Sequence, residues 1–89
     1  MVETTLNSPV SSVVKNLKRG DILNVEIQVS STQVRTLVAK ESSGQIAGSL
    51  TPPSLIKIIT CIEKGYQYVA IVLENVVGGV VRVRIQGKT

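Results

Sequence analysis

The sequence lacks histidine, tryptophan and phenylalanine altogether, and its 89 residues include one cysteine and two tyrosines. Without an imidazole there is no Ser-His or Cys-His nucleophile pair, no imidazole acid or base and no His metal ligand. Cys61 cannot form a disulfide within the chain, which is typical of a reduced thiol that fills the core of a cytoplasmic protein. These absences predict a protein that is not an enzyme and that uses neither a metal nor a cofactor.

Long apolar runs are also missing. No segment approaches the roughly 20 apolar residues that a membrane span requires. The first residues include Glu3 and lack both a basic start and a continuous apolar run, so they do not resemble a signal peptide. We therefore expect a soluble protein located in the cytoplasm.

Charge is the first positive feature of the sequence. Ten Lys and Arg residues against six Asp and Glu residues give a net charge of +4 and a pI near 9.6. This balance permits an acidic partner such as nucleic acid without requiring one.

The length allows one small domain. Residues 1–7 are polar and show no periodicity, so we expect a flexible tail there and a single β-barrel-like domain over residues 8–89. After Ser8 and Pro9, valines and a leucine recur at i, i+3, i+4 and i+7, which predicts a helix ending at Gly20. A strand over residues 10–14 is the alternative.

Five later segments have the composition and boundaries of strands, and in several of them apolar and polar residues alternate. They are residues 23–29, 33–40, 45–50, 66–74 and 80–86. Between the third and the fourth, an apolar stripe opened by Pro52 and Pro53 and ended by Gly65 predicts a second helix. The predicted fold is α+β but mainly β: a small five-stranded modified barrel with this helix between strands 3 and 4, preceded by an N-terminal helix.

The last two strands are predicted to form a hairpin. If Ile71 and Leu73 share the buried face with Val83 and Ile85, residue 71 faces 85 and residue 74 faces 82, around a loop at 77–79. This register places Glu74 opposite Arg82 as an exposed ion pair.

A weak internal repeat is also visible. A shift of 45 positions superposes the apolar positions of the first helix on those of the second, and Gly20 on Gly65. Two copies of a helix-strand-strand unit would explain the match, as would chance similarity between two amphipathic helices.

The order of elements resembles the HIRAN domain over residues 20–86. The resemblance lies in Gly20-Asp21-Ile22-Leu23 before a strand, in the strand at 34–38, and in the run from Gly44 to Leu50 followed by an apolar helix. It implies a small modified β-barrel that recognises single-stranded DNA ends. Two departures affect the positions expected to line the end-binding pocket: residues 30–33 replace an Asn-Pro-x-Asp signature, and Ser49 stands where an aromatic residue or His is common. Arg35 and Lys57 remain as phosphate contacts under this resemblance.

The candidate binding residues are Arg35, Lys57, Arg82, Arg84 and Ser49. If the three arginines project from one sheet face, they form a stripe that can hold phosphates, although arginines on strands also serve solubility and edge protection. Tyr66 and Tyr68 are either a small stacking platform for bases or core residues.

Two functions are consistent with these features. The first is a non-enzymatic, HIRAN-like module that holds single-stranded DNA or a DNA end on a basic barrel face. The second is a protein-interaction module or a self-associating homodimer without nucleic-acid binding. Its support is the apolar segment 66–73, which offers more aliphatic surface than a small monomer easily buries. A homodimer would hide the excess, and strand pairing at an edge is a simple route to it.

Overall fold

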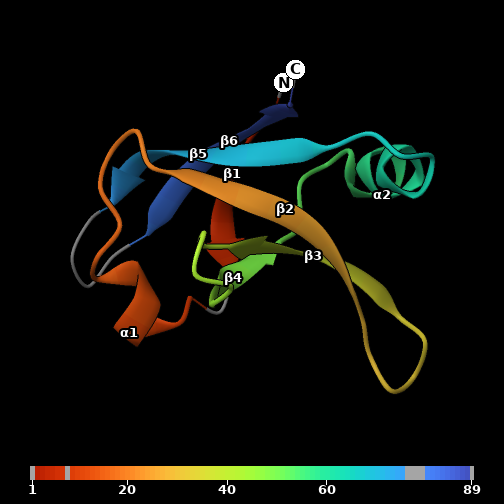
Figure 1. Cartoon of the computed structure of the whole chain (residues 1–89), viewed down its shortest axis with the longest axis horizontal. Helices are drawn as coiled ribbons and strands as arrows, with labels where there is room; N and C mark the ends of the chain where they lie inside the picture. The colour runs from red at the N-terminus through yellow and green to blue at the C-terminus, as the bar shows by residue number, and fades with distance from the viewer. Residues whose placement is uncertain (1, 8, 76–79, 89) are drawn as a thin grey trace.

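The computed structural model describes residues 2–7, 9–75 and 80–88 of the chain. These residues form six antiparallel strands and two short helices (Figure 1). In chain order the elements are β1 (Val2–Asn7), α1 (Ser11–Val14), β2 (Ile22–Val29), β3 (Arg35–Lys40), β4 (Ile46–Leu50), α2 (Leu55–Glu63), β5 (Tyr68–Asn75) and β6 (Val81–Gly87). The strands close a barrel in the order β1-β4-β3-β2-β5-β6.

The prediction of a small, mainly β barrel is confirmed, but the number of strands and the flexible tail were wrong. Residues 2–7 form β1, which pairs with β6 through Val2 to Thr5 and with β4 through Leu6 and Asn7. Since β1 fills the gap between β4 and β6, this sixth strand is what closes the barrel. Five strands would leave two open edges.

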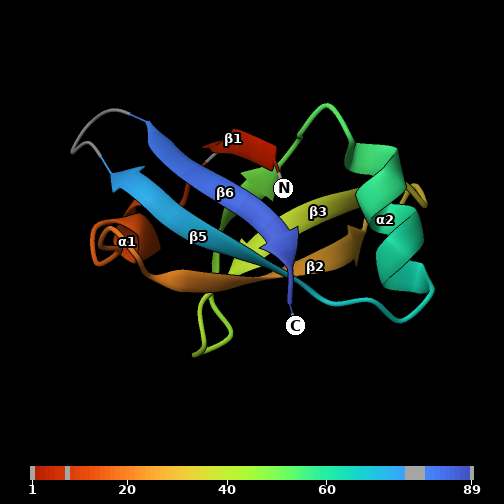
Figure 2. The same ribbon diagram turned by 90° about the horizontal axis from the view of Figure 1, so that it is seen from above.

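The two helices lie at opposite ends of the barrel (Figure 2). The second helix was predicted correctly: Ile58 and Ile59 of α2 belong to the core, and Gly65 follows with a φ of 103°. The first is shorter than predicted, because its helical turn ends at Val14. Val13 and Leu17 are nevertheless buried in the same core as α2.

The core is the barrel interior. Its largest fully buried side chains are Leu23, Leu37, Leu50, Ile59, Ile85, Val72, Val81 and Val83. Among the described residues no polar or charged residue is buried. Alternation along each strand therefore separates an inner apolar face from an outer face that carries most of the charge.

The β5–β6 hairpin differs from the predicted register. Ala70 faces Ile85 and Val72 faces Val83, and the register then shifts by one residue at Leu73, so that Glu74 faces Arg82 as predicted. The predicted pairing of residues 71 and 85 was wrong. A β-bulge adds one residue to a single strand and reverses which side chains point inward. Consequently residues 70 and 72, rather than 71 and 73, face the core, and the predicted loop at 77–79 lies outside the described residues.

The structure contains an internal repeat. The order β1-α1-β2-β3 recurs as β4-α2-β5-β6, and the strand pairing recurs with it. The numbers of paired residues sum to 87 between β1 and β6, as for Thr4 with Val83, and also between β3 and β4 up to the irregularity after Ala39, as for Ala39 with Gly48. The repeated unit is thus a strand-helix-strand-strand unit, one strand longer than the unit suggested by the sequence.

Candidate nucleic-acid interface

Several of the cations lie on the outer face of β6 and around the cleft beside it. Because Val81, Val83 and Ile85 point into the core, the alternating residues of this strand point outward. The outward row consists of Arg82, Arg84 and Gln86 and is continued by Lys88, whose amide donates to the Gln67 carbonyl at 2.8 Å. We call this row, the outward residues of the neighbouring strands β1 and β5, and those of β2 beyond β5 the β6 face.

A strip of apolar residues runs beside the cations. Arg84 faces Ile71 of β5, and Ile71 faces Ile22 of β2. The Ile22 side chain is 62% exposed, which is unusual for a large aliphatic residue. The β6 face therefore combines a cationic row with an adjacent apolar strip.

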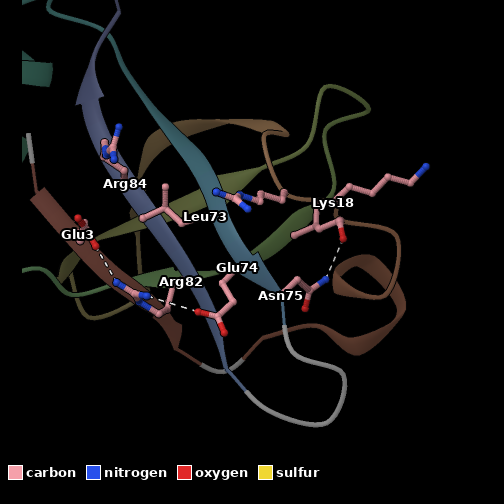
Figure 3. Close-up of a pocket in the computed structure, with 9 residues that line it drawn as sticks. Glu3, Lys18, Leu73, Glu74, Asn75, Arg82 and Arg84 are labelled. Atoms are coloured by element: carbon pink, nitrogen blue, oxygen red, sulfur yellow. Dashed lines mark hydrogen bonds and ion pairs between the residues drawn. The ribbon is translucent and has the colours of Figure 1, made fainter.

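At the α1 end, the β6 face opens into a cleft of about 640 Å³, which we call the basic cleft (Figure 3). Its lining residues are Glu3, Leu17, Lys18, Arg19, Leu73, Glu74, Asn75, Arg82 and Arg84. Four cations thus surround the cleft against two carboxylates. Two of these cations, Lys18 and Arg19, come from the segment after α1. No pattern in the sequence indicates that this segment lies beside β6.

Backbone and amide contacts hold that segment against β5. The Asn75 Nδ2 donates to the carbonyl oxygens of Val14 and Leu17, both at 2.9 Å. The Gly20 amide donates to the Val72 carbonyl at 2.7 Å. Asn75 therefore fixes the chain that carries Lys18 and Arg19 at the edge of the cleft.

The arginines of β6 differ in how they are neutralised. Arg82 lies between two carboxylates, with Nη2 at 2.7 Å from Glu3 Oε1 and Nη1 at 3.4 Å from Glu74 Oε2 (Figure 3). The second contact confirms the predicted cross-strand ion pair. These groups are about half exposed, so each pair is worth about 1 kcal/mol or less.

Arg84 has no such partner among the described residues. Its Nε is buried and makes no hydrogen bond to any of them. A buried donor is normally paired, and this one is an exception among the described residues. Within the described part of the chain, Lys18, Arg19, Arg84 and Lys88 form no ion pair. The basic cleft and the row beyond it therefore carry uncompensated positive charge.

The other predicted binding residues lie elsewhere. Arg35, at the start of β3, forms an ion pair with Glu63 of α2, and Lys57 is exposed on α2. The Ser49 hydroxyl on β4 donates to the Asn7 carbonyl at 3.2 Å. In the barrel order, β3 and β4 are across from β6 and β5. The five predicted residues thus do not form one site, and only the two arginines of β6 belong together.

The tyrosines occupy the opposite end of β5. Tyr66 is 63% exposed, whereas Tyr68 is half-buried and packs against the core. A hydrogen bond with the Cys61 thiol, together with partial burial, raises the pKa of the Tyr68 phenol above its ordinary value of 10.0. One tyrosine is therefore partly a core residue and the other is available to a ligand.

The described residues contain no group of three or more Cys, Asp or Glu side chains placed to hold a metal ion. In the same residues, neither helix has the length and apolar character needed to cross a membrane.

Comparison of the chain with protein-family models, with curated proteins and with solved structures finds no match. The HIRAN resemblance therefore rests on the sequence motifs alone.

Proposed function

We propose that this protein is a non-enzymatic nucleic-acid-binding module that holds a single strand across the β6 face. The observation that carries the proposal is the row of outward cations on and after β6, which runs from the basic cleft to Lys88. Phosphates would contact Arg84 together with Lys18 and Arg19. Bases would lie over the apolar strip formed by Ile22 and Ile71.

The composition of the β6 face supports this proposal over a purely electrostatic one. A cationic row alone would attract any polyanion, but a neighbouring apolar strip suits the unstacked bases of a single strand. In duplexes the bases are stacked inside, so such a strip would gain nothing from them. Single-stranded DNA is accordingly the preferred ligand, with end recognition as the narrower form that the HIRAN resemblance implies.

Fluorescence anisotropy with a labelled single strand of about 16 nucleotides, the upper end of ordinary site sizes, tests the proposal. Binding weaker than about 10⁻⁴ M at physiological salt would refute it. Arg84→Glu is expected to weaken binding and to reduce the slope of log affinity against log salt by about 0.7 or more. Lys57→Glu makes the same charge change on α2 and is the matched control, expected to leave affinity almost unchanged.

A second measurement separates end recognition from binding along the strand. Oligonucleotides with a free and a blocked 3′ end are compared at the same salt concentration. Tighter binding of the free end supports the HIRAN-like form of the proposal. Equal binding supports contacts with the backbone along the β6 face.

Self-association is the second candidate, and the β2–β3 hairpin favours it. β2 pairs with β5 only as far as Val25, while its pairing with β3 continues to Val29, so the hairpin extends away from the barrel (Figure 1). Val29 is 55% and Val34 is 54% exposed. β5 itself lies between β2 and β6 and so offers no free edge for pairing with a second copy. Sedimentation that gives a monomer at high concentration would eliminate this candidate.

A further inference from the structure

A second cleft opens where β2 separates from β5. The two strands pair from Ile22 with Ile71 to Val25 with Tyr68, and beyond that point β2 continues toward the hairpin. The cleft at the separation has a volume of about 200 Å³. It is lined by Asn24, Val25, Glu26, Ile62, Tyr66, Gln67, Tyr68 and Lys88, and we call it the tyrosine cleft.

The walls of this cleft combine aromatic, aliphatic and polar residues. Both tyrosines of the chain line it, together with Ile62 and the buried Val25. Tyr68 is partly buried and packs against the core. The Tyr66 ring, in contrast, is largely exposed. An exposed aromatic ring beside an apolar wall suits a planar ligand that stacks on it.

The rim of the cleft supplies polar groups of a particular kind. Asn24 and Gln67 have side-chain amides, each with a donor and an acceptor, and neither amide is used in a side-chain hydrogen bond within the described residues. The Glu26 carboxylate is already paired with Lys40 at 3.2 Å. Adjacent donors and acceptors are what the edge of a nucleobase presents.

The position of the cleft links it to the basic row. Lys88 is the outward residue that follows Gln86, and it also lines the tyrosine cleft. Lys88 lies six positions after Arg82, which corresponds to about 20 Å along an extended chain. A strand whose phosphates follow β6 from the basic cleft would therefore bring a base to the tyrosine cleft.

We infer that the tyrosine cleft binds a nucleobase, which stacks on Tyr66 and forms hydrogen bonds with the amides of Asn24 and Gln67. This inference rests on the proposed function, because it takes the base from the same strand whose phosphates lie on β6. A free nucleotide offers the same chemistry, so the experiment includes both sources.

The test compares Tyr66→Ala with Tyr66→Phe in the anisotropy assay. Loss of one stacked base is expected to weaken oligonucleotide binding roughly ten- to hundredfold, whereas the Phe variant keeps the ring and stays close to the wild type. Ile56→Ala removes another highly exposed apolar side chain, 70% exposed on α2, and is the matched control. Since Tyr66 is exposed, its replacement is expected to leave the far-UV circular dichroism spectrum and the melting temperature unchanged.

Two further measurements, with an abasic strand and with Arg84→Glu, distinguish a failure of the base site from a failure of the proposed function. An abasic strand keeps its phosphates but loses every base contact, including those with Ile22 and Ile71, so it should bind the wild type at least as weakly as the normal strand binds Tyr66→Ala. If Arg84→Glu weakens binding of the normal strand but Tyr66→Ala does not, the base site is refuted and phosphate binding stands.

Binding of thymidine monophosphate, followed by NMR of the tyrosine ring signals, is the second arm. Shifts of the Tyr66 ring signals that saturate, with or without oligonucleotide binding, support the base site with a free nucleotide as its source. If neither the mononucleotide nor the oligonucleotide affects these signals, the inference is overturned.

Discussion

Asn75 is predicted to be the most important polar side chain for the stability of the α1 end. Its Nδ2 donates to two carbonyl oxygens, those of Val14 and Leu17, in a partly buried setting. A hydrogen bond of this kind contributes about 0.5–1.5 kcal/mol, so Asn75→Ala should cost about 1–3 kcal/mol of the free energy of unfolding. For a domain of this size, a loss of about 2 kcal/mol lowers the melting temperature by roughly 10 °C.

Urea denaturation followed by circular dichroism measures this loss, and the m value is expected to stay constant. Asn24→Ala is the control, because this amide is exposed and makes no side-chain hydrogen bond with the described residues. Asn75→Asp sharpens the test, since a carboxylate of the same shape cannot donate and would face two carbonyl oxygens. The reasoning is refuted if the Ala and Asp variants both remain within about 0.5 kcal/mol of the wild type, the range of ordinary surface substitutions.

Three further predictions concern the barrel. A Cβ added at Gly48 lies 3.1 Å from the nearest backbone oxygen, so Gly48→Ala should destabilise by about 1–3 kcal/mol in urea, while Gly87→Ala, with open space around it, should be close to neutral. The raised pKa of Tyr68 means that its proton is released more readily after unfolding, so its contribution to stability is full below about pH 10 and is lost as pH rises through the raised value. In urea melts at a series of pH values, the free energy of unfolding of Tyr68→Phe should fall less above pH 10 than that of the wild type. The free energy of unfolding of Tyr66→Phe should fall as that of the wild type does. A circular permutant that joins the termini and opens the exposed turn at 42–43 should fold cooperatively, because the start of β1 pairs with β6; a molten chain by near-UV circular dichroism would contradict the barrel closure.

Local periodicity was sufficient to predict most of the barrel. Leu23 and Val25 alternate with polar residues over several positions, and they are buried as that pattern predicts. β1 was missed because its inward positions are only Val2, Thr4 and Leu6, and a short threonine-containing segment resembles a tail until β4 and β6 are present to pair with it. The bulge at Leu73 could not be predicted, since an extra residue in one strand leaves the apolar pattern unchanged in appearance.

The candidate site, too, was predictable only where local sequence patterns determine it. Arg82 and Arg84 were predictable neighbours, because residues two apart on a strand share a face. The contribution of Lys18 and Arg19 depends on tertiary contacts through Asn75, which no local pattern encodes. Separation of Arg35 from the arginines of β6 likewise depends on the strand order, which places β3 across the barrel.

Comparison of the two halves of the internal repeat supports a binding surface on only one face of the barrel. In the other half of the chain β3 holds the place of β6, and the residues that alternate with its core side chains Leu37 and Ala39 are Thr36, Val38 and Lys40. Val38 is only 3% exposed, and Lys40 is paired with Glu26 at 3.2 Å. The two halves share a backbone arrangement but not a charge pattern, so the repeated fold does not by itself account for the cations on β6. A nucleic-acid strand that follows one face of the barrel needs phosphate contacts on that face alone. Within the described residues, free cations on and after β6 and their absence from the matching positions of β3 are consistent with such one-sided binding.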